Sequence, residues 1–75
     1  MRPISKTTRQ HLAQLAEELS DWDQLIWEAR EWLLDCFGET EEDEIYIESM
    51  TVLEVMLAVE RFHAGGWSHF VELAC

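Results

Sequence analysis

The sequence predicts an all-α fold, a small four-helix single domain with short connections. Turn-forming residues are scarce, with one Pro at position 3 and three Gly in 75 residues, which favours helices over a strand-rich fold. Apolar residues recur at intervals of three and four, the spacing of helix faces. The chain is 48% hydrophobic and holds four Trp, so one core can form and disorder is not expected.

The first element expected is a helix over about residues 8–19. Residues 1–7 precede it as a short basic N-terminal arm, because Arg2 and Lys6 lie there. Thr7 or Thr8 supplies the hydroxyl that an N-cap needs. The apolar stripe of this helix consists of Leu12, Leu15, Ala16 and Leu19.

The second expected helix, over about residues 21–37, organises the rest of the chain. Ser20 or Asp21 is the predicted N-cap, and Gly38 stands where helices commonly end. Its main apolar face contains Trp22, Leu25, Ile26, Ala29, Trp32, Leu33 and Cys36. Trp27 and Leu34 fall on a second apolar strip. A helix that is apolar on two sides is either central to a bundle or partly reserved for a partner.

Residues 39–48 are predicted to form an acidic loop. Between Glu39 and Glu44 only Thr40 is not acidic, and like charges this dense repel one another, which favours an exposed segment. Thr40 can cap a turn with Asp43 near its third position. Residues 45–47 fit either a short strand or a helical turn, and we expect a turn.

Two more helices are expected, over about residues 51–64 and 67–74. Thr51 and Glu54 have the spacing of a capping box. The apolar face of the third helix is Val52, Val55, Met56, Val59 and Phe62. Gly65 and Gly66 end this helix, and the last one carries Trp67, Phe70, Val71 and Ala74.

The charge is strongly negative and unevenly placed, with 16 acidic against 5 basic residues. From Gln10 onward the only bases are Arg30 and Arg61, which leaves that segment at about −14. Such a surface repels nucleic acid and anionic membranes and attracts basic proteins. We therefore expect neither a nucleic acid nor a membrane as a direct partner. The simpler alternative is that the acidity only keeps the protein soluble.

The sequence favours neither catalysis nor metal binding. His63, His69 and Cys75 are six residues apart, and His11 and Cys36 lie elsewhere, whereas zinc ligands have closer paired spacings. The acidic run lacks the alternating ligands and central Gly of a calcium loop. No nucleophile has a base in a signature context. Two unpaired Cys and the absence of a signal peptide or apolar span indicate the cytoplasm. No enzyme activity, cofactor or metal is expected.

The candidate site is an acidic, protein-binding surface. Asp21, Glu28 and Asp35 recur every seven residues, about 10 Å apart along a helix axis, and the acidic run extends this row. Trp27 and Leu34 add apolar contact, since Trp is favoured at interface hot spots. The predicted partner-binding residues are Asp21, Glu28, Glu31, Asp35, Glu39, Glu41, Glu42, Asp43, Glu44, Trp27 and Leu34. Their carboxylates would take the places of phosphates in a basic nucleic-acid-binding groove.

In size, single-domain build, Trp content and acidic run, the chain resembles the small acidic phage anti-CRISPR proteins that act on type I surveillance complexes. The resemblance implies that it blocks target-DNA binding by occupying a DNA- or PAM-reading subunit in a bacterial host cell. Acidic DNA mimics aimed at restriction enzymes or nucleoid proteins fit nearly as well. We expect a monomer or a weak dimer.

Two alternatives remain open. Glu48-Ser49-Met50 and the following residues 51–60 resemble the Asp-Ser-Leu motif and recognition helix of acyl carrier proteins, which implies Ser49 as a phosphopantetheine attachment point. The other alternative is a helical adaptor or antitoxin-like subunit. In that case Trp27 and Leu34 bury against a partner helix and the charge is incidental.

Overall fold

The computed structural model describes residues 3–74. This part of the chain contains five helices joined by short connections. They are α1 (Lys6–Glu18), α2 (Gln24–Phe37), α3 (Glu41–Glu48), α4 (Val52–Phe62) and α5 (Gly66–Ala74). The expected all-α single domain is confirmed, but the expected number of four helices is wrong. The additional helix is α3, which lies in the segment expected to be a loop.

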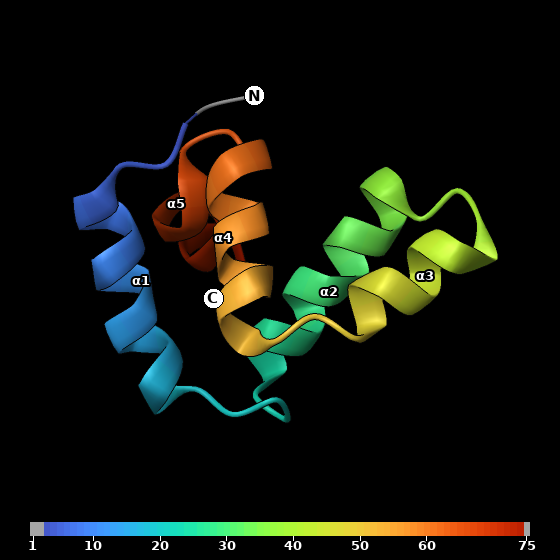
Figure 1. The fold of residues 1–75 in the computed structure, drawn as a ribbon, viewed down its shortest axis with the longest axis horizontal. Coiled ribbons are helices and arrows are strands. Elements are labelled where there is room, and N and C mark those ends of the chain that lie inside the picture. Colours follow the sequence, from blue (N-terminus) through green and yellow to red (C-terminus); the bar gives the residue numbers. More distant parts are fainter. Residues whose placement is uncertain (1–2, 75) are drawn as a thin grey trace.

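Helix α4 is the centre of the packing. It packs against α1, α2 and α5, whereas α3 packs mainly on α2. Figure 1 shows α2 and α3 as an antiparallel pair that extends to the right, away from α1, α4 and α5. The connection between α1 and α2 runs along the bottom of the same view. The α2–α3 connection and the α1–α2 linker therefore lie at opposite ends of α2.

The core forms where the predicted apolar faces of α2 and α4 meet. Ile26 and Ala29 of α2 and Val55 and Val59 of α4 have no exposed surface. Burying an aliphatic side chain of this size stabilises the fold by about 1.5–3 kcal/mol. The buried core consists of Leu12, Ile26, Ala29, Leu33, Ile47, Val55, Met56, Val59, Trp67 and Phe70.

The first two helices begin at N-caps that differ from those expected. Ser5 caps α1, and its Oγ accepts a hydrogen bond from the Thr8 backbone N–H at 3.1 Å. Asp23 caps α2 by accepting from the Leu25 backbone N–H at 2.9 Å. The expected caps at Thr7 or Thr8 and at Ser20 or Asp21 are wrong. Helix α2 therefore starts at residue 24 rather than 21, and residues 19–23 form the α1–α2 linker.

Most of the predicted acidic loop 39–48 is helix α3, which corrects that expectation. Thr40 is its N-cap, with the Oγ1 atom accepting from the Asp43 backbone N–H at 3.2 Å. The first turn contains four acidic residues, 41–44, and the positive end of the helix dipole stabilises carboxylates at that place. That stabilisation offsets the repulsion between them. Ile47 is buried against α2, while Ile45 and Tyr46 are exposed.

Three residues expected on core faces lie elsewhere. Trp22 is 93% exposed because it belongs to the linker and not to α2. Cys36 is an exposed free thiol in the last turn of α2, beyond Leu33, the last buried residue of this helix. Phe62 is half-exposed and packs against Phe37, with ring centroids 4.9 Å apart.

The last two helices come close to their predicted bounds. The predicted capping box of α4 is confirmed: Thr51 and Glu54 each accept a hydrogen bond from the backbone N–H of the other. Helix α4 ends at Phe62, and α5 begins at Gly66. Gly65 and Gly66 turn the chain with φ angles of 85° and 73°. Of the predicted basic arm, Met1 and Arg2 lie outside the described residues, as does Cys75, and Lys6 is in α1.

Candidate protein-interaction site

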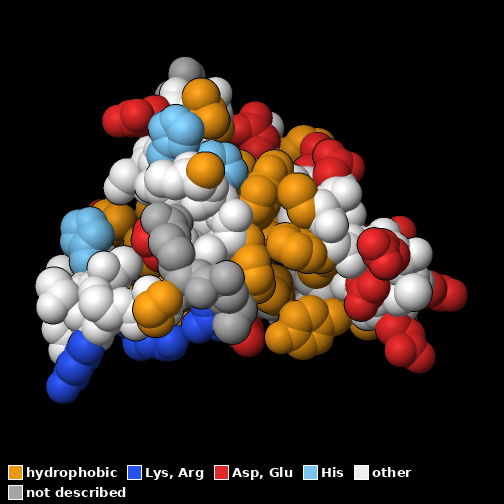
Figure 2. All heavy atoms as spheres, turned by 90° about the horizontal axis from the view of Figure 1, so that it is seen from above, with side chains coloured by type: hydrophobic (Ala, Val, Ile, Leu, Met, Phe, Trp, Pro, Cys, Tyr) orange, Lys and Arg blue, Asp and Glu red, His pale blue; other side chains and the backbone are white. Residues whose placement is uncertain are grey.

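The α2–α3 hairpin concentrates the acidic residues of the chain. Residues 24–48 hold nine of the 16 acidic residues and one base, Arg30. Figure 2 shows acidic side chains gathered at the end of the molecule that α3 and the α2–α3 connection form, beside exposed hydrophobic side chains. The nine acids are Glu28, Glu31, Asp35, Glu39, Glu41, Glu42, Asp43, Glu44 and Glu48.

A hollow of about 300 Å³ lies on this hairpin. Trp27, Arg30, Glu31 and Leu34 of α2 line it together with Glu48 of α3. The Trp27 side chain is 55% exposed. Three residues predicted from the sequence, Trp27, Glu31 and Leu34, are thus brought together. Arg30 and Glu48 were not predicted: Arg30 lies on the same face of α2 as Trp27 and Leu34, whereas the place of Glu48 depends on how α3 packs along α2.

The remaining predicted acids of α2 follow one side of the helix. Glu28 is half-buried and accepts a hydrogen bond from Gln24 Nε2 at 3.3 Å, while Glu31 and Asp35 are exposed. At 1.5 Å of rise per residue, Glu28 and Asp35 are about 10 Å apart along the axis. This part of the predicted acidic row is a property of α2.

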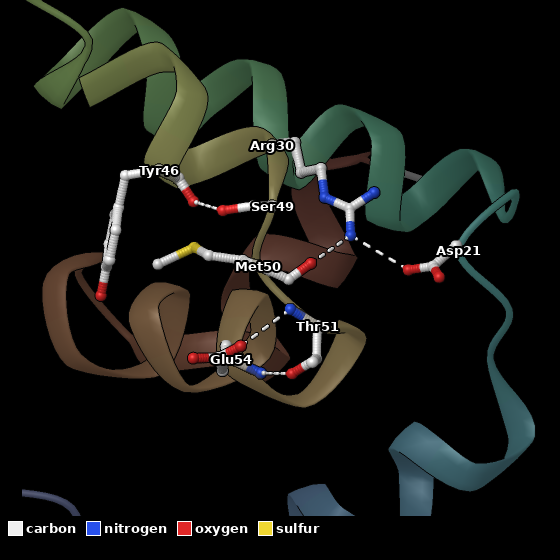
Figure 3. A network of polar contacts seen from close by, with 7 residues as sticks. All are labelled: Asp21, Arg30, Tyr46, Ser49, Met50, Thr51 and Glu54. Carbon is white, nitrogen blue, oxygen red and sulfur yellow. Dashed lines mark hydrogen bonds and ion pairs between the residues drawn. The ribbon is translucent and has the colours of Figure 1, made fainter. Parts of the chain in front are cut away.

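Asp21 does not belong to that row, because it lies in the linker before α2. The expected seven-residue repeat starting at Asp21 is therefore wrong as a feature of one helix. Its Oδ1 atom accepts a hydrogen bond from Arg30 Nη2 at 3.0 Å. The same Nη2 atom donates to the Met50 carbonyl oxygen at 2.6 Å, as Figure 3 shows. Arg30 thus joins the linker, α2 and the α3–α4 connection and balances the charge of Asp21.

The acids of residues 39–44 divide between two surfaces. Glu39, Glu41, Glu42 and Glu44 are exposed at the end of the hairpin. Asp43 is half-buried and lines a second hollow of about 230 Å³ between α2, α3 and α4. The other side chains around that hollow are hydrophobic or aromatic: Leu33, Phe37, Tyr46, Ile47, Met50, Ala58 and Phe62. No local pattern in the sequence predicts this hollow, because it depends on how α2, α3 and α4 are arranged.

Ser49, the residue singled out by the acyl-carrier resemblance, is the exposed C-cap of α3. Its hydroxyl donates to the Tyr46 carbonyl oxygen at 2.9 Å (Figure 3). Thr51, two residues later, caps α4. Ser49 therefore lies between two helices, with its hydroxyl on the surface and engaged in a local hydrogen bond.

The His residues near the α4–α5 turn contact the backbone. The Nδ1 atoms of His63 and His69 lie 2.8 Å and 2.7 Å from the Ala64 carbonyl oxygen, which can only accept. Within residues 3–74, no three His, Cys, Asp or Glu side chains are grouped so that they could hold a metal ion. No helix in the same part of the chain is long and apolar enough to cross a membrane.

Comparisons of the chain with family models, curated proteins and solved structures give no match. The chemistry of the site is therefore argued from its geometry. Exposed carboxylates at the hairpin end can pair with Lys and Arg side chains. The exposed Trp27 indole, in the first turn of α2 beside Glu31 and Glu48, can enter a pocket of a partner. The arrangement suits the binding of a basic protein.

Proposed function

We propose that this protein is an inhibitor that binds the basic nucleic-acid-binding groove of another protein through the α2–α3 hairpin. Carboxylates of the hairpin occupy the positions that phosphates would take, and Trp27 and Leu34 make the apolar contact. The first target to test is a DNA- or PAM-reading subunit of a type I CRISPR complex, because of the resemblance to phage anti-CRISPR proteins.

The observation that carries the proposal is the position of Trp27 among the acids of the hairpin. The indole is 55% exposed and shares a hollow with Glu31 and Glu48. Arg30 is the one base among the described residues that line this hollow, and its guanidinium is paired with Asp21. An exposed Trp beside two carboxylates gives an apolar anchor on a hairpin of strongly negative net charge. The field of that charge speeds encounter with a basic partner, whereas the anchor adds lifetime and specificity.

Competition for DNA tests the proposal directly. A type I surveillance complex is mixed with a fluorescently labelled target duplex, and fluorescence polarisation reports bound DNA as this protein is added. We expect bound DNA to fall, and the inhibition to weaken steeply as salt rises, because the interaction is electrostatic. No inhibition at any concentration would exclude this target.

Two matched double variants locate the binding surface. The pair Glu41→Lys with Glu42→Lys changes the charge of the hairpin end. The pair Glu17→Lys with Glu72→Lys makes the same change on α1 and α5, where both residues are exposed. The first pair should weaken inhibition by about tenfold or more and the second by about twofold or less. Equal losses would mean that net charge, rather than the hairpin, determines binding.

The salt response also separates this proposal from the helical adaptor. An adaptor that buries Trp27 and Leu34 against a partner helix gains affinity mainly from apolar area, which salt does not screen. Affinity that stays nearly constant with ionic strength would favour the adaptor. The same titration with the Glu41→Lys and Glu42→Lys pair should then show no loss.

The exposure of Ser49 favours one further candidate, the acyl carrier protein. A phosphopantetheinyl transferase with coenzyme A would modify the Ser49 hydroxyl, and intact-mass spectrometry would detect the added group. The Ser49→Ala variant is the control. An unmodified protein after complete conversion of a known carrier would exclude this candidate.

A further inference from the structure

A third hollow, mostly apolar, lies at the junction of α1, α2 and α5. It measures about 360 Å³ and is lined by Leu15, Glu18, Leu19, Leu25, Trp67, Ser68 and Val71. Trp67 is buried at 4% exposure and contributes to its wall. The hollow is separate from the hairpin site, since no residue is shared between the two.

Trp22 lies in the α1–α2 linker and is almost fully exposed; it does not line the hollow itself. It is three residues from Leu19 and three from Leu25, both of which line the hollow. Three residues of chain span at most about 10 Å. The indole is therefore within reach of the opening. An exposed Trp leaves a large apolar surface in water, and binding a partner would remove it.

The residues on both sides of Trp22 are held by hydrogen bonds and one ion pair. Asp21 forms the ion pair with Arg30, and Asp23 caps α2. The Asp23 backbone N–H also donates to the Ser20 carbonyl oxygen at 3.1 Å, closing the turn. The linker thus presents the indole from an ordered turn rather than from a loose chain. A preorganised aromatic side chain loses less entropy when it binds.

The charge around the hollow is negative. Of the described residues, Glu18 is the one charged side chain that lines it, and Glu17 is its exposed neighbour. Both lie in the last turn of α1, where there is no basic residue. The negative end of the helix dipole disfavours carboxylates there. A cation supplied by a partner would remove this unfavourable interaction.

We propose that the hollow and Trp22 together bind a cationic amphipathic helix of a partner protein. Its apolar side chains enter the hollow beside Trp67, its Lys or Arg side chains pair with Glu17 and Glu18, and Trp22 packs over it. This surface is an addition to the hairpin site and does not depend on the function proposed for the hairpin.

The test uses the full chain labelled with 5-fluorotryptophan, which gives a separate ¹⁹F NMR signal for each Trp. Two synthetic probes of about four helical turns are compared, one of Leu and Lys and one of Leu and Glu in the same amphipathic pattern. The Leu/Lys probe should shift the Trp22 and Trp67 signals in a saturable way. Equal binding of the Leu/Glu probe would overturn the charge argument and with it the proposal.

Two variants and one matched control complete the test, with affinity read from the Trp67 signal. Trp22→Ala and Glu18→Gln should each weaken the binding of the Leu/Lys probe, by about tenfold for the Trp variant. Trp27→Ala removes an exposed indole from the hairpin and should change this affinity by about twofold or less. Unchanged affinity in Trp22→Ala and Glu18→Gln would overturn the proposal, as would an equal loss in Trp27→Ala.

The result is independent of the DNA-competition experiment. Its variant pair, Glu41→Lys with Glu42→Lys, lies in the first turn of α3 and lines no part of this hollow. The signals of the Trp residues that each variant keeps, three in the Trp variants and four in Glu18→Gln, show in the same spectra whether the variant is folded. Each proposal is therefore tested by its own measurement, and failure of one does not contradict the other.

Discussion

Arg30 donates a hydrogen bond from Nη2 to Asp21 Oδ1 over 3.0 Å. The two side chains differ in environment, because 16% of the Arg30 side chain and 63% of the Asp21 side chain are exposed. The guanidinium also donates to the Met50 carbonyl oxygen. The two residues therefore differ in structural role. Arg30 joins three segments of the fold, whereas Asp21 contributes only one of the contacts of Arg30.

The first prediction follows from this difference. Arg30→Met should lower the free energy of unfolding by about 1–3 kcal/mol, because the Met50 carbonyl loses its donor in a partly buried place. Asp21→Asn should cost about 0–1 kcal/mol, the usual range for an exposed ion pair. Urea denaturation of both variants measures the difference. Equal losses would show that the ion pair, and not the Met50 contact, accounts for the role of Arg30.

The second prediction concerns the capping box at the start of α4. The pKa of Glu54 is lowered, first because the Thr51 backbone N–H donates to its carboxylate and second because of a hydrogen bond with the Thr51 side chain. Since the pKa is lower in the folded chain than in the unfolded one, the unfolded chain binds more protons between the two values. The stabilisation is complete above the unfolded pKa and is lost as the pH falls through the folded pKa.

Thermal melts of the wild type and of Glu54→Gln test this sign. The wild type should be more stable at about pH 7, and the gap should close as the pH is lowered to about 2. Glu17→Gln removes an exposed carboxylate that caps no helix and lies in the last turn of α1, so this variant should be no less stable than the wild type at either pH. A gap for Glu54→Gln that persists at low pH would mean that the charge of Glu54 is not its source.

The periodic apolar pattern predicted the core of α2 and α4 but not where α2 begins. Ile26, Ala29 and Leu33 are buried as expected. Trp22 fits the same three- and four-residue spacing, yet it precedes the Asp23 cap. Spacing alone cannot show that a turn interrupts a pattern. The Asp23 side chain sets the start of α2 by accepting one hydrogen bond from the Leu25 backbone N–H. Other polar residues nearby, such as Ser20 and Asp21, are equally suitable N-caps by residue type.

The acidic run is helical because the helix dipole offsets the repulsion between its carboxylates, which by itself favours an exposed loop. The predicted capping by Thr40 is confirmed, and the backbone N–H that its side chain binds is that of Asp43, as expected. A capped first turn is where carboxylates are most favourable in a helix. The grouping of Trp27 with Glu31 follows from α2 alone, whereas Glu48 joins them only through the packing of α3 on α2. Such contacts between helices leave no trace in local spacing.

The third prediction concerns Gly66, which has a φ of 73°. An Ala in that left-handed conformation costs about 1–2 kcal/mol. Its Cβ would also stand 2.6 Å from Glu60 Oε1, the atom that accepts a hydrogen bond from the Trp67 backbone N–H. We expect Gly66→Ala to lower the free energy of unfolding by at least this backbone cost. Urea denaturation measures it, with Ser68→Ala on the exposed side of α5 as the control that should change little.

The fourth prediction contrasts the two Trp residues of α2. Trp32 packs edge-on against Phe70 and Phe37, with centroid separations of 6.1 and 6.4 Å, so Trp32→Ala should cost about 3–5 kcal/mol of stability. Trp27→Ala removes a half-exposed indole and should cost less than about 1 kcal/mol.

Trp27→Ala should cost little stability but much binding if the hairpin is the interaction surface. Trp27→Ala should weaken DNA competition by about tenfold or more while the chain stays folded. Urea denaturation and the polarisation assay on the same preparations give both quantities. If Trp27→Ala lost as much stability as Trp32→Ala, the exposed indole would be a structural residue and the anchor of the proposed interface would be absent. Full inhibition by a stable Trp27→Ala variant would equally remove the indole from the binding surface, leaving the carboxylates alone to account for it.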